Sequence, residues 1–402
     1  MSRLPTGARR ALLLTALGQL LVLSLWFSAS AVAPQLGVEW GLDTGGEAWL
    51  TLAVQVGFVA GALVSAVLNV ADVVPARRLF FMSAIGGAIA NLGLLTVDRG
   101  ETPLAIGLRL LTGMFLAGVY PAGLKVMAGW FRSARGMALG VLVGAVTVGS
   151  ASPHLIRGLG FEWQGVLAAA SGLALLGALV MLGVGDGPHE VPTPRFRWSQ
   201  VAVVASNRGV RLSTLGYLGH MWELYGMWTW VGAFLAASAE SAGTSFGSVA
   251  VVTFLVIAIG GAGSWWAGIA ADRLGRTRVA GTAMVISGSC ALLTSVVFGA
   301  GPWLVVPLLL VWGLSVVADS AQFSAMVTET ASDETRGTAL TLQTALGFLL
   351  TLVTIRAVPA IAEGATWRWA FPILAVGPAL GTWAMIRLAR SPMASQLAGG
   401  RG

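Results

Sequence analysis

Twelve apolar runs, each about as long as a helix that crosses a bilayer, constrain the fold of this chain more than any other feature. A membrane-spanning helix needs ~20 predominantly apolar residues. Charged residues make up 10% of the chain, well below the roughly 25% of soluble domains. The runs lie at 11–36, 46–70, 79–97, 103–129, 136–156, 164–184, 211–236, 246–271, 279–299, 303–327, 337–358 and 367–388. We therefore predict an all-α membrane protein with 12 transmembrane helices.

The positions of the basic residues predict the orientation of these helices. Of the 24 Lys and Arg, 18 fall on the N-terminal side of the predicted spans, four on the opposite side, and Arg109 and Lys125 within a span. Because Lys and Arg are enriched in cytoplasmic loops, both termini are expected in the cytoplasm. The net charge of +7 is then a topology signal at the lipid headgroups, and we expect no nucleic-acid partner.

A polar stretch rich in Pro and Gly, residues 185–210, divides the chain. Such composition is typical of a loop. We interpret it as a cytoplasmic linker between two six-helix halves, residues 1–184 and 211–402.

Two pairs of matching segments indicate that the second half is a copy of the first. The loop Gly268–Arg278 has a degraded counterpart 200 positions earlier at Ala71–Arg78, with Asp272 aligned to Asp72. The segment Arg135–Leu139, which opens the fifth span, matches Arg336–Leu340, which opens the eleventh, at an offset of 201. Parallel repeats of six spans are one architecture of alternating-access transporters.

The residues of these loops resemble the signature loop of the major facilitator superfamily, and the chain resembles that family over nearly its whole length. The resemblance is carried by Gly268, Ala271, Asp272, Arg273, Gly275, Arg276 and Arg278, and by Arg109 and Gly113 in the fourth span. It implies two pseudo-symmetric six-helix bundles that expose a central cavity to each side of the membrane in turn. It also implies a cytoplasmic gate formed by Asp72, Arg78, Gly268, Asp272, Arg273, Gly275 and Arg276.

Polar side chains inside the spans are the candidate substrate and proton sites. An ionised group at the bilayer centre costs ~2.5–3.5 kcal/mol on insertion scales, so each is a functional candidate. The candidate residues are Trp26, Gln55, Arg109, Tyr120, Lys125, His220, Trp222, Glu223, Asp319 and Gln322.

Three of these assignments have specific alternatives. On an uninterrupted helix Arg109 and Tyr120 are 11 residues apart and share a face, but Arg109 could instead be a structural hydrogen-bond hub. Glu223, with His220 one turn away, could carry a proton or form a fixed salt bridge. Asp319 could pair with Lys125, since both lie at comparable depth in repeat-related spans.

Small residues recur every four positions in several spans, including Gly57, Gly61 and Ser65 in the second and Gly260, Ser264 and Gly268 in the eighth. Small residues let membrane helices approach closely. We expect these faces to be packing surfaces between the two halves.

Several functional classes lack support in the sequence. The chain has no Walker loop, no His or Glu spacing typical of zinc, and no nucleophile elbow, so we expect neither an enzyme nor a cofactor or metal site. The single Cys290 excludes a disulfide within the chain.

We predict a secondary active transporter of a small organic solute, driven by a proton gradient or by exchange. The cations Arg109 and Lys125 favour an anionic or zwitterionic solute. The alternatives are a proton-coupled drug exporter and, in another class, a membrane sensor that transports nothing. The expected setting is the lipid bilayer of the bacterial inner membrane, and the expected state is a monomer.

Overall fold

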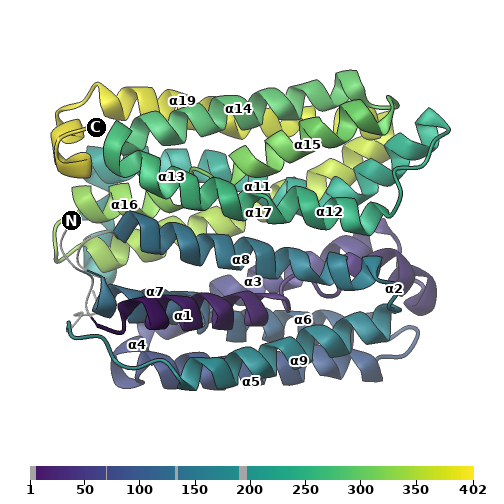
Figure 1. Ribbon diagram of the computed structural model, residues 1–402, viewed down its shortest axis with the longest axis horizontal. Coiled ribbons are helices and arrows are strands. Elements are labelled where there is room, and N and C mark those ends of the chain that lie inside the picture. The colour runs from purple at the N-terminus through teal and green to yellow at the C-terminus, as the bar shows by residue number, and fades with distance from the viewer. Residues whose placement is uncertain (1–5, 69, 132–134, 190–196) are drawn as a thin grey trace. The chain divides into compact units, whose positions relative to one another are not determined.

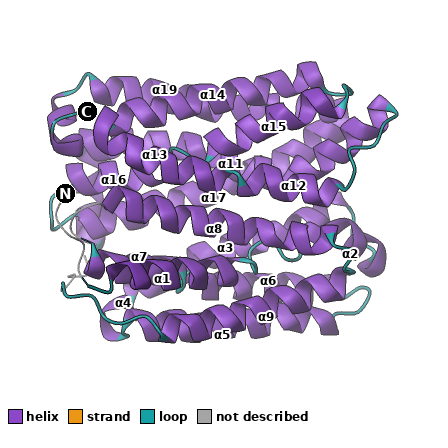
Figure 2. Ribbon diagram, in the orientation of Figure 1, coloured by secondary structure: helices purple, strands orange, loops and turns teal. Residues whose placement is uncertain are grey.

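The computed structural model describes residues 6–68, 70–131, 135–189 and 197–402, and every regular element in them is a helix (Figure 2). The chain divides into two compact units, Met1–Thr193 and Pro194–Gly402. This boundary falls inside the predicted linker at 185–210.

Unit 1 contains the first nine α-helices (Figure 1). They are α1 (Ala8–Leu23), α2 (Ala33–Trp40), α3 (Thr44–Val67), α4 (Val70–Val73), α5 (Ala76–Gly93), α6 (Thr102–Leu116), α7 (Tyr120–Trp130), α8 (Arg135–Gly158) and α9 (Trp163–Leu182), with 3-10 turns η1 (Ser30–Val32) and η2 (Leu94–Thr96).

Unit 2 contains the remaining helices. They are η3 (Trp198–Gln200), α10 (Val201–Ser206), α11 (Arg208–Ala242), α12 (Val249–Ala258), α13 (Gly260–Leu274), α14 (Arg276–Val297), α15 (Pro302–Val316), α16 (Ser320–Thr330), α17 (Arg336–Ala365), α18 (Trp367–Ala370), η4 (Pro372–Ala375), α19 (Val376–Ala389) and η5 (Pro392–Gly399).

Helix bounds in the two units repeat at the offset that the sequence indicated. Helices α6 and α7 begin at Thr102 and Tyr120, and α15 and α16 begin at Pro302 and Ser320, 200 residues later. Helix α8 begins at Arg135 and α17 at Arg336, 201 residues later. The duplicated six-helix architecture is therefore confirmed.

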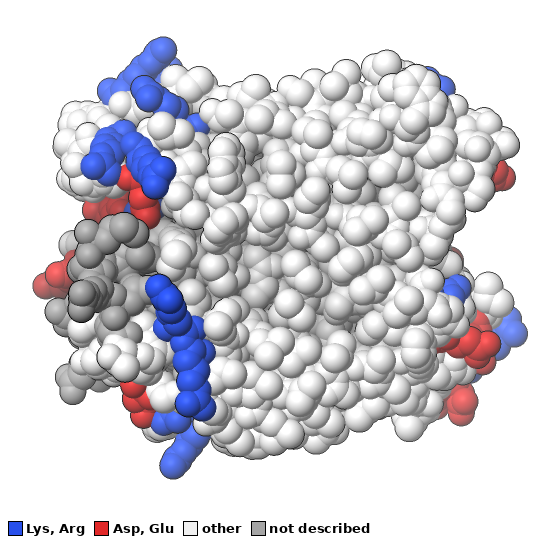
Figure 3. All heavy atoms as spheres, in the orientation of Figure 1, with Lys and Arg blue, Asp and Glu red and all other residues white. Residues whose placement is uncertain are grey.

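Ten segments in the described residues are long and apolar enough to cross a membrane. They match all the predicted spans except the first and the seventh. Helix α1 has only 16 residues, and α11, with 35 residues, carries several polar side chains along its length. On the face shown in Figure 3, charged side chains gather at the ends of the helices in each unit, and the band between the ends carries none.

The predicted first span at 11–36 is interrupted. Helix α1 ends at Leu23, and turns follow up to Ala29. The hydroxyl of Ser24 donates to Leu21 O at 2.6 Å and that of Ser28 to Leu25 O at 2.9 Å. Ser24 Oγ also reaches Ala170 O on α9 at 3.0 Å, and Ser28 Oγ reaches Asn91 Oδ1 on α5 at 2.7 Å, so the two hydroxyls tie this interrupted segment to neighbouring helices.

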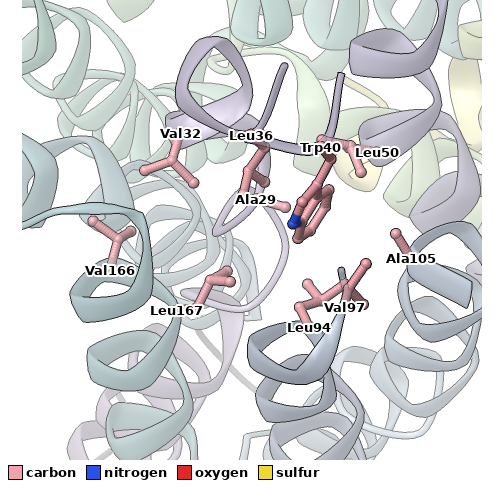
Figure 4. Packing of buried hydrophobic residues seen from close by; sticks show 10 residues of the cluster. All are labelled: Ala29, Val32, Leu36, Trp40, Leu50, Leu94, Val97, Ala105, Val166 and Leu167. Atoms are coloured by element: carbon pink, nitrogen blue, oxygen red, sulfur yellow. The ribbon is translucent and has the colours of Figure 1, made fainter. Parts of the chain in front are cut away.

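The segment after this break closes the end of unit 1 opposite its Arg-rich loop. Leu36 and Trp40 of α2 pack into an apolar cluster with residues from the ends of α5, α6 and α9 (Figure 4). The cluster consists of Ala29, Val32, Leu36, Trp40, Leu50, Leu94, Val97, Ala105, Val166 and Leu167.

Glycines bring the second and fourth spans of each half into backbone contact. A Cβ at Gly57 would collide with Leu110 O, and one at Gly113 with Val54 O, so α3 and α6 touch without intervening side chains. In unit 2 a Cβ at Gly313 would collide with Val256 O in the same way. The expectation that Gly57 and Gly61 face the other half is therefore wrong, because both pack inside their own unit.

Candidate functional site

The break between α15 and α16 in unit 2 carries an acidic side chain deep in the tenth span. Asp319 precedes the first residue of α16, where the positive end of the helix dipole stabilises a carboxylate. Its Oδ1 lies 2.8 Å from Nδ1 of His220 on α11, and both side chains are almost fully buried. The structure thus gives Asp319 a partner that the sequence analysis did not assign to it.

The second nitrogen of His220 has no hydrogen-bond partner. Nε2 is buried, and no described residue offers it a donor or an acceptor. The ring lies against Tyr217, at 6.1 Å between centroids, and against Phe323, at 5.7 Å. A carboxylate that orients one nitrogen of an imidazole while the other stays open is an arrangement suited to proton transfer.

Glu223 lies one turn beyond His220 on α11 and is held by neutral donors. Ser287 Oγ on α14 donates to Oε2, and Trp312 Nε1 on α15 donates to Oε1, each at 2.7 Å. Glu223 is 1% exposed and has no basic partner among the described residues. The salt-bridge alternative thus has no support within the described part of unit 2.

Arg276 connects the second-half signature loop to α16. Its guanidinium donates to Glu329 at 2.7 Å and to Gln322 Oε1 at 3.1 Å, while Asp272 lies at 3.8 Å. Gln322 follows Asp319 by one turn, so this network ends next to the buried His220–Asp319 pair.

The other residues of this loop have smaller contacts. Gly268 is buried on α13, whereas Arg273 is exposed. Gly275 has φ +96° and separates α13 from α14, a conformation that L side chains rarely adopt.

The end of the chain packs against this same loop. Ala398 N donates to Glu329 Oε2 at 3.1 Å, Arg401 Nη1 donates to Asp272 O at 2.6 Å, and Thr277 N donates to Gly402 O at 3.3 Å. Leu397 is fully buried beside these contacts. The tail, residues 392–402, therefore joins the ends of α13, α14 and α16.

In unit 1, Arg109 is a hub of hydrogen bonds to neutral oxygens. Nε donates to Leu50 O at 3.0 Å, and the terminal nitrogens donate to Leu25 O, Trp26 O, Ser28 Oγ and Asn91 Oδ1. Arg109 is fully buried, and none of these partners is acidic. The guanidinium thus ties the break after α1 to α3 through Leu50 and to α5 through Asn91.

The shared helical face predicted for Arg109 and Tyr120 is wrong. The fourth span breaks between Leu116 and Tyr120, so the two residues lie on different helices, α6 and α7. Pro121 explains the break, because it has no N–H to bond Ala117 O and it restricts the residue before it.

Two further fourth-span candidates lie at or after this break. The carbonyl of Tyr120 accepts from Gln19 Nε2 at 3.1 Å, and its side chain is half-buried. Lys125 is half-buried on α7.

The remaining cavity candidates fall on three helices or turns. Trp26 lies in the break after α1 with its ring 5.1 Å from Phe58. Trp222 on α11 donates to Ile373 O at 3.0 Å. Gln55 on α3 is fully buried, and neither atom of its amide has a hydrogen-bond partner among the described residues.

The first-half loop forms a different contact from the one expected. Arg77, and not the exposed Arg78, forms an ion pair with Asp186 at 2.7 Å. The side chain of Asp72 lies outside the described residues.

Sequence reasoning missed three residues of the unit 2 network: Ser287, Trp312 and Glu329. Glu329 had a usable signal, because it lies seven residues, about two turns, after Gln322 and close to the same helical stripe. Trp312 had none, since the break between α15 and α16 separates it from Asp319. Ser287 had none, since a serine in an apolar run most often bonds its own helix. Among the described residues no group of three His, Cys, Asp or Glu could hold a metal ion.

A multi-span chain with two repeated six-helix units, broken fourth and tenth spans and buried ionisable groups belongs to the class of secondary transporters. The chain is a member of the Major Facilitator Superfamily, whose family model matches residues 15–247, more than half of the sequence. It is therefore a multi-pass membrane transporter and not an enzyme.

The fold is also that of a solved transporter. A crystal structure of a mutant of the nucleoside transporter NupG matches with a TM-score of 0.67 and 17% identity, covering 94% of this chain and 99% of that one. A comparison with curated proteins finds no match.

Proposed function

We propose that this protein is a secondary active transporter in which protons are exchanged at the Glu223, His220 and Asp319 cluster of unit 2. Proton movement through this cluster is coupled to the passage of a small organic solute by alternating access. The observation that carries the proposal is the combination of a buried carboxyl with neutral partners only and, one turn away, an imidazole with an open Nε2.

The physical argument concerns the cost of charge at this depth. An ionised carboxylate inside a membrane protein is retained when it has a partner or a function. Glu223 has only neutral donors, so its charge is not balanced by a fixed cation within the described part of unit 2. A group of this kind can gain and lose a proton without breaking an ion pair.

The solute remains as the sequence predicted it, anionic or zwitterionic, on the basis of Arg109 and Lys125 in the fourth span. Within unit 1, Arg109 donates to five neutral oxygens, so Lys125 carries more of this prediction than Arg109 does. Because a nucleoside transporter shares the fold, uridine belongs in the first substrate panel.

Reconstitution into proteoliposomes tests proton coupling. Uptake of labelled lactate, alanine, uridine and a hydrophobic cation is measured with and without an imposed pH gradient, and the wild type should accumulate a solute only with the gradient. Transport of the hydrophobic cation with proton counterflow would instead support the exporter alternative.

The Glu223→Gln variant should lose gradient-driven accumulation of that solute but keep solute exchange at equal pH. Ser289→Ala is the matched control, because Ser289 lies on α14 near Ser287 but is exposed and bonds its own helix at Val285 O. Unchanged gradient-driven accumulation in Glu223→Gln would disprove the proton assignment.

We further propose the bacterial inner membrane as the location, with both termini in the cytoplasm and a monomeric state. Maleimide labelling of a cysteine introduced at Ser206 should occur only in permeabilised cells if the orientation is correct. Light scattering of the purified protein in detergent reports the number of chains.

A further inference from the structure

The amide of Gln343 is buried in unit 2 with nothing to bond. Gln343 on α17 is 1% exposed, and neither its Oε1 nor its Nε2 has a hydrogen-bond partner among the described residues. An amide offers one acceptor and two donors, and native proteins leave few such groups unmatched when they are buried. A structural glutamine at this position would be expected to bond a neighbour.

The position of Gln343 on α17 is fixed by the packing of that helix on α11. A Cβ at Gly347 would collide with the ring of Tyr217, and a Cβ at Gly226 would lie 3.4 Å from Thr354. Helices α11 and α17 therefore run parallel to each other. Gln343, one turn before Gly347, lies beside the turn of α11 that precedes Tyr217.

This part of unit 2 also contains the ring cluster of the proton site. Tyr217 lies 6.2 Å from Phe323 and 6.1 Å from His220 between ring centroids. His220 Nε2 is a further buried polar atom here without a hydrogen-bond partner among the described residues. Aromatic walls with a few unmatched polar groups are the usual composition of a small-molecule site.

We propose that Gln343 is a solute-recognition residue, and that the transported solute presents a hydrogen-bond donor and an acceptor side by side. Nε2 of Gln343 donates a hydrogen bond to the acceptor of the solute, and Oε1 accepts one from the donor of the solute. The rings of Tyr217 and Phe323 contact the apolar part of the solute. This inference rests on the proposed transport function and narrows the solute class.

Two kinds of solute have the required chemistry. A planar amide or imide edge, as in uridine, places a donor beside an acceptor, and so do the ammonium and carboxylate of a zwitterion such as alanine. A plain anion such as propionate has no hydrogen-bond donor next to its carboxylate, so it cannot satisfy both amide atoms. The inference therefore excludes simple anions from the predicted anionic or zwitterionic range.

The decisive variant is Gln343→Met, which keeps the length of the side chain and removes both polar atoms. Purified protein in detergent is melted with and without uridine, alanine or propionate, and the apparent affinity is taken from the concentration dependence of Tm. We expect uridine or alanine to raise the Tm of the wild type, and roughly 30-fold weaker affinity in Gln343→Met for two lost hydrogen bonds.

The melting temperature without solute separates recognition from a structural role. If Gln343 serves the solute, Gln343→Met removes an unmatched polar group and should melt at the same temperature as the wild type or higher. A structural glutamine would give a lower Tm. The control Thr351→Val, on the same helix, removes a hydroxyl that bonds only its own helix at Phe348 O and should leave the affinity unchanged.

Three outcomes would overturn the inference: a lower Tm of solute-free Gln343→Met, unchanged affinity in that variant, or stabilisation of the wild type by propionate but by neither uridine nor alanine. None of them bears on proton coupling, which the Glu223→Gln accumulation assay tests separately.

Discussion

Replacing Arg109 by Lys is the sharpest test of what this buried cation does. The guanidinium donates to five oxygens from three separate segments: Leu25, Trp26 and Ser28, then Leu50, then Asn91. A lysine at this position is also a cation, so the substitution does not remove the free-energy cost of burying a charge. Its three donors radiate from a single atom and cannot reach all five oxygens.

The magnitude follows from the hydrogen bonds that a lysine cannot replace. At least two of the five bonds to the charged guanidinium are lost, and each contributes about 1.5–3 kcal/mol, so Arg109→Lys should lose about 3–6 kcal/mol. Leu25 O and Asn91 Oδ1 each keep a bond from Ser28 Oγ. For a domain of the size of unit 1, each kcal/mol lowers Tm by about 2–4 °C, so we expect a drop of at least ~6 °C. Tryptophan fluorescence during heating in detergent gives this value.

The control variant is Arg99→Lys. Arg99 is exposed, so this variant should have the same Tm as the wild type. If Arg109→Lys also melts with the wild type but no longer transports, the hub interpretation fails, and Arg109 would be a group that contacts the solute.

The remaining predictions concern packing, the tail and the first-half loop. Gly313→Ala should destabilise the protein by about 1–3 kcal/mol, because the new Cβ meets Val256 O. Gly107→Ala, which has open space around it, should be neutral or stabilising by up to about 1 kcal/mol. Equal Tm values for the two variants would contradict this. Deleting residues 392–402 should speed maleimide labelling of Thr277→Cys in a Cys290→Ser background, because the tail covers Thr277; an unchanged labelling rate would count against that contact. Asp186→Asn should cost less than about 1 kcal/mol, since Asp186 in its pair with Arg77 is 81% exposed; a drop in Tm as large as that of Arg109→Lys would show that this pair is structural.

The architecture could be predicted because it depends on long-range regularities of the sequence. Apolar runs of membrane length and the alignment of Asp72 with Asp272 are visible without coordinates, and both correspond to the observed helices and their repeat. The interruption after Leu23 could not be predicted in the same way. It is held by contacts that form only in the folded chain, namely the bond from Ser24 Oγ to Ala170 O and the bond from Ser28 Oγ to Asn91 Oδ1.

The composition of the site was partly predictable, whereas its pairing was not. His220, Glu223 and Asp319 were evident as ionisable residues in apolar runs. Their partners come from other helices, so that Asp319 meets His220 and Glu223 meets Ser287 and Trp312. Helical spacing describes one helix at a time and carries no information about which faces meet. Gln343 was missed because an unmatched amide is recognised only once its neighbours are known.

The interruption of the fourth span at Tyr120 and of the tenth at Ser320 has an evolutionary consequence. At the offset of 200 residues, Asp319, His220 and Glu223 correspond to Val119, Leu20 and Leu23. Both halves thus share the same interruption, but only the second half has ionisable side chains at these three aligned positions. The two halves have therefore diverged in function: the first half keeps apolar residues at these positions, whereas the second half has gained ionisable ones.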